Sequence, residues 1–259
     1  MSLLMIGCGK MGGSLLTRWA TSTDHKITII NPSLVKAPSG VKVTQTIEEL
    51  AGQRFDIIVI AIKPQLIAQV LPAYRPYFSN NACVISIAAG YSVASIEQLI
   101  GEHAIIRMMP NLPAQIGHGV SALYANSSCS KTQIETAKLL ADAIGYTHLA
   151  NSEDELDRVT AVAGSGPGYA FELARCWIES AMNLGFSPQA AKALVLNTLG
   201  GSIELAMSSD KNVTSLRDSV ISKNGTTEAG LQALMKDSTL NTLMESTVVA
   251  AYERAVALR

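Results

Sequence analysis

The stretch Leu3-Leu4-Met5-Ile6-Gly7-Cys8-Gly9-Lys10-Met11-Gly12 decides the fold. Its four apolar residues are typical of a buried strand, and they run directly into three glycines with the spacing Gly-x-Gly-x-x-Gly. The residues that follow place Leu15, Leu16 and Trp19 on one face of a helix. A strand, a glycine turn and a helix in this order predict the start of a doubly wound α/β fold.

Each glycine of this turn has a physical role in binding a dinucleotide. The first glycine permits a tight turn, the second lets the backbone approach a pyrophosphate, and the third lets the helix pack close to the strand. The positive end of the helix then faces the anion. We therefore expect a dinucleotide to contact the turn, the alternative being a tight strand-to-helix connection without a ligand. The expected contacts are Ile6, Gly7, Cys8, Gly9, Lys10, Met11 and Gly12.

The two halves of the chain follow different patterns. Short apolar runs alternate with helical stretches in the first half, which predicts parallel strands buried on both faces. The composition from Ser152 onward is rich in Ala, Leu, Glu, Lys and Ser with helical periodicity, and Gly164-Ser-Gly-Pro-Gly168 indicates close helix packing or a hinge at the domain junction. We predict a Rossmann-type doubly wound parallel sheet over residues 1–151 and an all-helical domain over residues 152–259. The expected strands are Leu3 to Ile6, Ile27 to Ile30, Ile57 to Ile62, Cys83 to Ile87, Ala104 to Met108, Val120 to Tyr124 and Tyr146 to Leu149.

The composition excludes several classes of protein. Of the 259 residues 48% are apolar and 16% are charged, below the roughly 25% charged that is usual for soluble domains. The longest strictly apolar run, Ile57 to Ile62, is too short to span a bilayer, so we expect no membrane insertion. The net charge of -1 without a basic cluster argues against nucleic acid as a partner. The apolar excess instead predicts two domains or a large subunit interface.

The four cysteines predict the cellular compartment. Cys8, Cys83, Cys129 and Cys176 lie at least 46 residues apart and have no metal-type spacing, so we expect buried thiols, no metal site and a reducing, cytoplasmic environment. Leu3 to Ile6 already has the pattern of a strand, so we expect no targeting segment before it.

The end of the second expected strand bears on the choice of cofactor. An acidic residue there would hold the ribose 2′-hydroxyl of NAD and repel the 2′-phosphate of NADP. The sequence instead reads Asn31-Pro-Ser33, and Asn31, Ser33 and Lys36 offer hydrogen-bond donors. We therefore favour NADPH, with NADH as the alternative, and a simple turn as the interpretation without a ligand.

Two further strands end in tails that we expect beside the cofactor, because ligands of open parallel sheets lie beyond the carboxyl ends of the strands. The first tail contains Ala61, Ile62, Lys63 and Pro64. The second tail offers the small residues Ala88, Ala89 and Gly90, which would leave room for a flat ring.

The helical half contains a second candidate site, Ser222-Lys-Asn-Gly-Thr-Thr227. Hydroxyls and a glycine before a helix are typical of an N-cap, and this interpretation needs no ligand. The same atoms suit a small carboxylate, because the free N–H groups at Gly225, Thr226 and Thr227 and the hydroxyls of Ser222 and Thr227 would together form a site for it. Both interpretations remain open at this point.

Over essentially its whole length the chain resembles the pyrroline-5-carboxylate reductases. One departure is Lys223-Asn224, where the family usually has Pro-Gly. Loss of the proline should loosen the loop, and Asn224, in place of glycine, must tolerate whatever backbone conformation that site requires. A second departure, Gly168 in place of alanine, changes little. The matching segments are Ile6 to Gly12, Ala61-Ile-Lys-Pro-Gln65, Ser86-Ile-Ala-Ala-Gly90, Met109-Pro-Asn-Leu-Pro113, Gly164-Ser-Gly-Pro167 and Leu216 to Leu231.

The resemblance implies an activity, a reduction of L-1-pyrroline-5-carboxylate to L-proline by hydride transfer from NADPH or NADH in the last step of proline biosynthesis. It implies that the substrate carboxylate lies on Gly225 to Thr227 with Ser222 assisting, and that Thr227 is the catalytic candidate facing the ring nitrogen. Asn111 would line the nicotinamide end of the site. The resemblance also implies a homodimer or higher oligomer formed through the helical domain.

Two acidic residues, Glu153 and Asp210, match positions where the family often places a carboxylate near the substrate. An anion there would favour the iminium form of the substrate. The alternative is a solvated acid at a helix end.

Two other functions are weighed against this one. A β-hydroxyacid dehydrogenase also joins a Rossmann domain to a helical one, and Lys192 offers the lysine that such enzymes use, although the surrounding motif does not match. A non-catalytic dinucleotide sensor would need no second small-ligand loop, which argues against that class.

Overall fold

A computed structural model describes residues 1–33 and 36–259 of the chain. The described residues form two compact units, one of residues 1–167 with 250–259 and the other of residues 168–249. The boundary predicted at residues 151 and 152 stays a prediction. The boundary between the compact units lies beyond the change in composition at Ser152. α5 (Glu153–Val159) packs against the sheet and thus belongs to the first unit.

An eight-stranded sheet forms the centre of the first unit, in the order β3-β2-β1-β4-β5-β6-β7-β8. Neighbouring strands from β3 to β6 are parallel, as predicted for buried apolar runs. The strands are β1 (Ser2–Ile6), β2 (Lys26–Ile30), β3 (Lys42–Thr44), β4 (Phe55–Ile60), β5 (Phe78–Ser86), β6 (Ala104–Pro110), β7 (Gly119–Ala125) and β8 (Gly145–Leu149).

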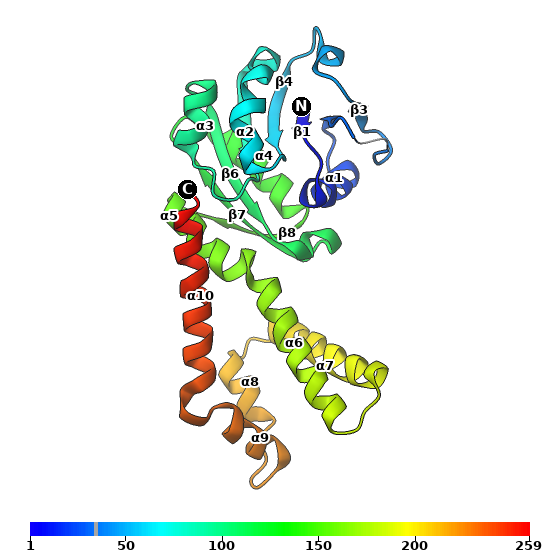
Figure 1. Cartoon of the computed structure of the whole chain (residues 1–259), viewed down its shortest axis with the longest axis vertical. Coiled ribbons are helices and arrows are strands. Elements are labelled where there is room, and N and C mark those ends of the chain that lie inside the picture. The colour runs from blue at the N-terminus through cyan, green and yellow to red at the C-terminus, as the bar shows by residue number, and fades with distance from the viewer. Residues whose placement is uncertain (34–35) are drawn as a thin grey trace. The chain divides into compact units, whose positions relative to one another are not determined.

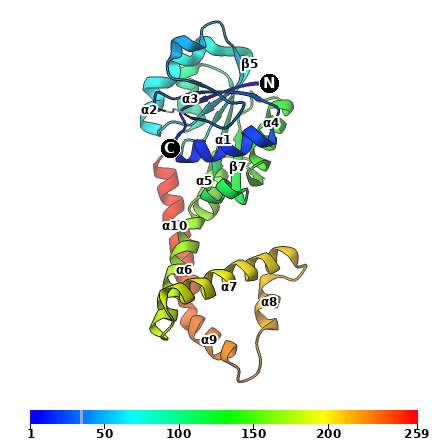
Figure 2. The ribbon, with the colours of Figure 1, turned by 90° about the vertical axis from the view of Figure 1, so that its right-hand side faces the viewer.

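Helices cover both faces of this sheet, so the doubly wound prediction is confirmed (Figure 1). Adjacent residues of β1 point to opposite cores: Leu3 packs with Trp19 of α1 (Lys10–Ser22), and Leu4 packs with Ile67 of α2 (Pro64–Val70). Figure 2 shows α1 and α4 on one face and α2 and α3 on the other. The remaining helical elements are η1 (Ile47–Leu50), η2 (Leu71–Tyr77), α3 (Val93–Ile100), η3 (Leu112–Ile116), α4 (Lys131–Asp142), α5 and the π-helix η4 (Thr160–Gly164).

The sheet differs from the prediction at two strands. β7 is antiparallel to β6, because the connection between Pro110 and Gly119 is too short for a crossover back to a parallel start. The three-residue strand β3 was not predicted, since so short a segment carries no clear apolar pattern.

The second unit is helical throughout its described residues, as predicted. Several helix starts have side-chain caps: Ser187 accepts a bond from the N–H of Ala190, and Asn212 accepts one from Ser215. The helices of this half are α6 (Gly166–Asn183), α7 (Pro188–Ser208), α8 (Val213–Ser219), α9 (Thr226–Leu234), η5 (Lys236–Ser238) and α10 (Thr239–Ala257), whose last turns return to the first unit.

The motif from Gly164 to Gly168 lies where the π-helix η4 ends and α6 begins, so the predicted interruption of the helical pattern is confirmed. A Cβ on Gly164 would lie 3.3 Å from Cγ2 of Thr160, which agrees with close packing there. No helix of the described residues is long and apolar enough to cross a bilayer.

The cysteine prediction is partly wrong. All four thiols are free and Cys83 is buried, but Cys8 and Cys129 are half-buried and Cys176 on α6 is exposed in the isolated chain. The sequence pattern shows that Cys176 lies in an apolar stretch. It does not show which face of the helix is covered.

Candidate active site

Gly7 occupies a conformation and a space that only glycine fits. Its φ is +82°, and a Cβ would lie 2.5 Å from Cγ2 of Ile62 and 2.9 Å from the carbonyl oxygen of Ala61. The N–H of Gly7 donates to the carbonyl of Ile30, which fixes the turn to the neighbouring strand β2. The tight turn predicted from the sequence is therefore present.

Gly9 and Gly12 differ in what surrounds them. Gly9 is the N-cap of α1, without a side-chain cap, and no atom lies within 4 Å of the position of a Cβ. At Gly12 a Cβ would come within 3.2 Å of Cβ of Ala61, so the helix packs closely on the chain after β4. The first turn of α1 contains no acidic residue. This open, positive helix end, which Cys8, Lys10 and Met11 border, fits a pyrophosphate.

The end of β2 forms a turn held by Asn31. Its Oδ1 accepts hydrogen bonds of 3.0 Å from both the N–H and the hydroxyl of Ser33, and its own N–H donates to Thr44. The alternative interpretation, a turn, is thus present in the structure. The Nδ2 of Asn31 has no hydrogen bond to another described residue, and Ser33 is exposed, so both remain available to a ligand.

The tails of β4 and β5 lie at the same sheet edge as the glycine turn. Ala61 donates its N–H to Ile6, while Lys63 is the exposed N-cap of α2 and precedes Pro64 at the first helical position. Ala88 is buried and Ala89 is exposed. These tails therefore border the predicted cofactor position.

Gly90 does not leave the free space that its sequence suggested. Its φ is +69°, and a Cβ would lie 2.5 Å from the carbonyl oxygen of Leu258 and 2.6 Å from its Cβ. The backbone after α10 occupies this room, which sequence reasoning missed because the two residues are 168 positions apart.

Asn111 is buried and ties two segments together. Its Nδ2 donates to the carbonyl of Ala163 (2.9 Å), and its Oδ1 accepts from the N–H of Val120 (2.8 Å). The amide thus holds the π-helix η4 and the start of β7 at the end of β6. One hydrogen of Nδ2 is left over, so contact with a nicotinamide remains a proposal.

Glu153 lies at the start of α5 and pairs with a buried cation. Its Oε1 accepts a 2.7 Å bond from Nη1 of Arg107, whose side chain is 1% exposed, and a 3.1 Å bond from the N–H of Val93. The alternative expected from the sequence, a solvated acid at a helix end, is therefore wrong for Glu153. Among the described residues Oε2 of Glu153 has no hydrogen-bond partner.

Further charges extend this cluster. Asp157 lies 4.0 Å from Nη2 of Arg107 and accepts a hydrogen bond from Nε of Arg259, while Asp154 accepts one from the hydroxyl of Tyr252. Burial alone would lower the pKa of Arg259, but its bond to Asp157 and the neighbouring carboxylates raise that pKa above its ordinary value. The hydroxyl of Tyr252 holds the pKa of Asp154 below its usual range.

The loop before α9 lies in the second unit. Gly225 is the N-cap, and no side chain caps the helix, so Thr226 and Thr227 are its first two residues and not its cap. The N-cap interpretation of these threonines is therefore wrong. A Cβ on Gly225 would overlap Oγ of Ser222, whose carbonyl accepts the N–H of Gly225 at 2.8 Å.

Asn224 adopts φ +59°, the left-handed conformation that a glycine normally provides. Asparagine is one of the few non-glycine residues that adopt this conformation readily. Its N–H donates to Oε2 of Glu228 in the first turn of α9. None of the hydrogen bonds within the described residues uses the hydroxyls of Thr226 or Thr227. These hydroxyls and the helix N-terminus fit a small anion. Asp210 is exposed in this unit.

Comparison with known proteins identifies the family. Residues 153–258 match the family described as pyrroline-5-carboxylate reductase dimerisation. The pyrroline-5-carboxylate reductase of Pseudomonas aeruginosa is 37% identical over 78% of this chain and 74% of its own length. The crystal structure of the Plasmodium falciparum pyrroline carboxylate reductase with NADP bound is 31% identical, with a TM-score of 0.87 over 100% of this chain and 98% of that one.

The chain belongs to the pyrroline-5-carboxylate reductase family.

Family membership confirms the resemblance seen in the sequence and makes the chain an NAD(P)H-dependent oxidoreductase. Residues 2–90 also match the family described as NADP oxidoreductase coenzyme F420-dependent, which agrees with a nucleotide on the glycine turn. The reductase structure from Coxiella burnetii is 31% identical with a TM-score of 0.91 over 99% of this chain and 97% of that one. The β-hydroxyacid dehydrogenase and sensor alternatives lose their support, and Lys192 lies exposed on α7.

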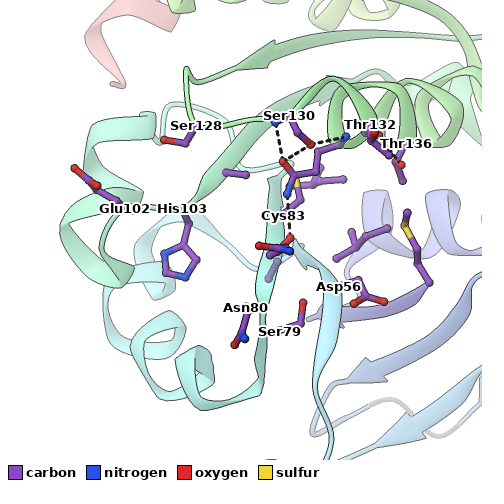
Figure 3. A pocket seen from close by; sticks show the side chains of 17 residues that line it. Asp56, Ser79, Asn80, Cys83, Glu102, His103, Ser128, Ser130, Thr132 and Thr136 are labelled. Atoms are coloured by element: carbon purple, nitrogen blue, oxygen red, sulfur yellow. Dashed lines mark hydrogen bonds between the residues drawn. The ribbon is translucent and has the colours of Figure 1, made fainter.

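A cavity in the described part of the chain lies elsewhere, at the amino ends of β4, β5 and β6 (Figure 3). Its volume is about 860 Å³, and none of the predicted site residues lines it. Gln133 reaches across to the carbonyl of Asn81 (3.0 Å). Ligands of such sheets bind at the carboxyl ends of the strands, where the glycine turn lies, and this cavity is at the opposite ends.

Sequence reasoning missed the charge cluster of this reductase. Arg107 is the one charge within the apolar run Ala104 to Met108, and a lone cation in a buried strand is itself a signal of a buried partner. No such signal marks Asp157 and Arg259, because they are far apart in the sequence and come into contact only in the folded chain.

Proposed function

We propose that this chain is an NADPH-dependent pyrroline-5-carboxylate reductase that produces L-proline. The observation that carries the proposal is the loop at Ser222 to Thr227: an uncapped helix N-terminus with two hydroxyls free of internal bonds, beside a glycine held in place by Ser222. Such a loop suits a small carboxylate, and the substrate is a five-membered ring that carries one.

The protein groups have few chemical tasks in this reaction. When bound, NADPH supplies a hydride from its nicotinamide to the carbon of the C=N bond. The N–H groups of Gly225 to Thr227 and the hydroxyl of Ser222 bind the substrate carboxylate and fix the ring. The hydroxyl of Thr227 orients the ring nitrogen and holds its proton.

Glu153 supports the protonated imine. Its Oε2 carries no internal bond, whereas Oε1 is held by Arg107 and Val93, so the carboxylate has a fixed orientation and one free oxygen. An anion near a cyclic iminium raises the pKa of that group and keeps it electrophilic.

NADPH is the cofactor we favour over NADH. The end of β2 offers the Nδ2 of Asn31 and the hydroxyl of Ser33, and neither of these residues carries a negative charge to repel a 2′-phosphate. The remaining cofactor contacts are those predicted: Ile6 to Gly12, Ala61 to Pro64, Ala88 to Gly90 and Asn111.

The enzyme works as a homodimer or a larger oligomer. The region from 152 to 259 leaves large apolar side chains exposed in the single chain, among them Phe171, Trp177, Ile203 and Leu205. Apolar surface on this scale needs a partner, and the match to a dimerisation family supports a second copy of the chain. The four free thiols support a cytoplasmic location.

The test follows nicotinamide absorbance with purified protein, pyrroline-5-carboxylate and either NADPH or NADH. We expect turnover with both and a higher kcat/KM with NADPH. Folded protein that consumes neither cofactor would contradict the proposal.

A Thr227→Ala variant tests the assigned role of the hydroxyl, with Thr227→Ser as the matched control. Removal of the hydroxyl should lower kcat at least tenfold while the Kd for NADPH stays within twofold, and the serine variant should retain most turnover. Equal turnover in the alanine variant would exclude a catalytic role of Thr227.

Loss of turnover in Lys192→Ala with intact cofactor binding would support the dehydrogenase alternative instead.

A further inference from the structure

A buried cation lies on β6 opposite Ser86, the last residue of β5, after which the Ala88–Gly90 tail follows. Arg107 on β6 has a side chain that is 1% exposed, and its Nε and Nη2 have no hydrogen-bond partner among the described residues. Its two carboxylate neighbours, Glu153 at 2.7 Å and Asp157 at 4.0 Å, both lie on α5. A buried charge is tolerated only with such partners, so Arg107 fixes α5 against β6.

The first of these carboxylates reaches the segment that follows β5. Oε1 of Glu153 accepts the N–H of Val93, the first residue of α3. That N–H belongs to the helix start, where backbone donors lack partners within the helix. Glu153 therefore holds the segment from Ala88 to Val93 at its far end.

The second carboxylate reaches the residues after α10. Asp157, almost fully buried, accepts a hydrogen bond from Nε of Arg259, and Nη2 of Arg259 lies 3.5 Å from Asp154. The adjacent Leu258 packs its backbone against Gly90 so closely that a Cβ there would meet its carbonyl at 2.5 Å. The same segment is thus also held at Gly90.

We propose that Arg259 is a positioning residue for the cofactor, because its bond to Asp157 keeps Leu258 on Gly90 and so fixes the Ala88–Gly90 tail. This inference rests on the proposed function, in which that tail borders the nicotinamide. Gly90 sits at φ +69° and a glycine backbone has many accessible conformations, so an unsupported tail would have to be ordered when the cofactor binds. Ordering at that step weakens binding. Arg259 removes this cost in advance.

The test measures the Kd for NADPH by fluorescence titration together with steady-state kinetics on the full chain. We expect Arg259→Ala to raise the Kd and the KM for NADPH about five- to tenfold, with KM for pyrroline-5-carboxylate and kcat at saturating NADPH changed less than twofold. Arg259→Lys keeps one charged donor and should recover part of the affinity.

Arg158→Ala is the matched control. Arg158 is also an arginine bonded to an α5 carboxylate, Asp154 at 3.1 Å, but its side chain is 61% exposed and its bond leaves the buried pair of Arg259 and Asp157 intact. Its NADPH affinity should stay within twofold of the wild type, as for other surface ion pairs.

Several results overturn the inference. The first is an Arg259→Ala protein that unfolds cooperatively and has an unchanged Kd for NADPH, even if its melting temperature falls. In that case the contact of Arg259 serves stability alone. If Arg259→Ala does not fold, Arg259→Gln, which keeps a neutral donor without the charge, replaces it, and an unchanged Kd for NADPH overturns the inference equally. Because binding is measured without the imine, a wild-type protein that lacked reductase activity would contradict the proposed function and leave this binding test intact.

Discussion

A Cβ on Gly225 would overlap Oγ of Ser222 and lie 2.9 Å from the carbonyl oxygen of the same serine. We therefore predict that Gly225→Ala displaces Ser222 and the N–H groups at the start of α9. The kcat/KM for pyrroline-5-carboxylate should fall at least tenfold, about 1.4 kcal/mol, while the Kd for NADPH stays within twofold. Gly230→Ala is the control: it lies within α9 with no atom within 4 Å of its Cβ position, and we expect full activity.

The left-handed backbone of Asn224 predicts opposite effects of two substitutions. Asn224→Gly removes the strain of a side chain at φ +59° and should raise the melting temperature slightly. Asn224→Val places a β-branched residue there and should destabilise the protein by about 1–2 kcal/mol. Thermal melts at one fixed protein concentration measure both, since an oligomer's stability depends on concentration. Equal melting temperatures for the two variants would show that the loop readily changes conformation.

The contacts of Gly7 predict a loss of cofactor binding on substitution. Gly7→Ala brings a Cβ within 2.5 Å of Ile62 and must reshape the turn, so the Kd for NADPH should rise at least about tenfold. Gly52→Ala is the matched control, because its φ of +74° carries the same backbone strain in open space. It should cost about 1–2 kcal/mol of stability with unchanged affinity for NADPH. Equal Kd values for the two variants would contradict a role of the turn in binding.

The pair Glu155 and His148 predicts a pH dependence of stability. Bonds from the backbone N–H of Asn151 and from the His148 ring, 2.8 Å away, lower the pKa of Glu155 to about 2. A carboxyl with a lowered pKa in the folded state stabilises it fully above its unfolded pKa near 4.5, and this contribution disappears as the pH falls toward 2. The melting temperature should thus fall from pH 5 to pH 2 more steeply in the wild type than in Glu155→Gln. Parallel curves would contradict this assignment.

The exposed apolar side chains of the helical region predict the oligomeric state. Sedimentation should give at least twice the 27.4 kDa of one chain at micromolar concentration. Ile203→Glu, at a side chain that is 59% exposed on α7, should shift the protein toward monomers, because a charge on this apolar surface opposes its burial by a partner. A wild-type monomer at all concentrations would contradict self-association.

Much of the fold follows from local sequence pattern. The runs around Met5, Ile58 and Val84 are apolar on both faces because both faces are covered, and that pattern alone predicts parallel strands between helices. The direction of β7 did not follow, since strand direction depends on the length of the connection and on where the chain returns in space.

The candidate site divides in the same way. The glycine turn could be predicted because the φ angle and close contacts at Gly7 admit no other residue. The left-handed φ of Asn224 was decided by the folded loop. The role of Gly90 could not, because its partner Leu258 is distant in the sequence.

The sequence by itself determined the Rossmann-type half, the helical half, the glycine turn and the family, since each follows from motifs and periodic patterns of residues that are close together in the chain. Only the tertiary structure decided that Arg107, Glu153, Asp157 and Arg259 form one cluster and that the end of the chain packs on the tail after β5. The physical reason is that a buried charge must find its counter-charges through space. Periodicity records which residues are covered, but not which distant residue covers them.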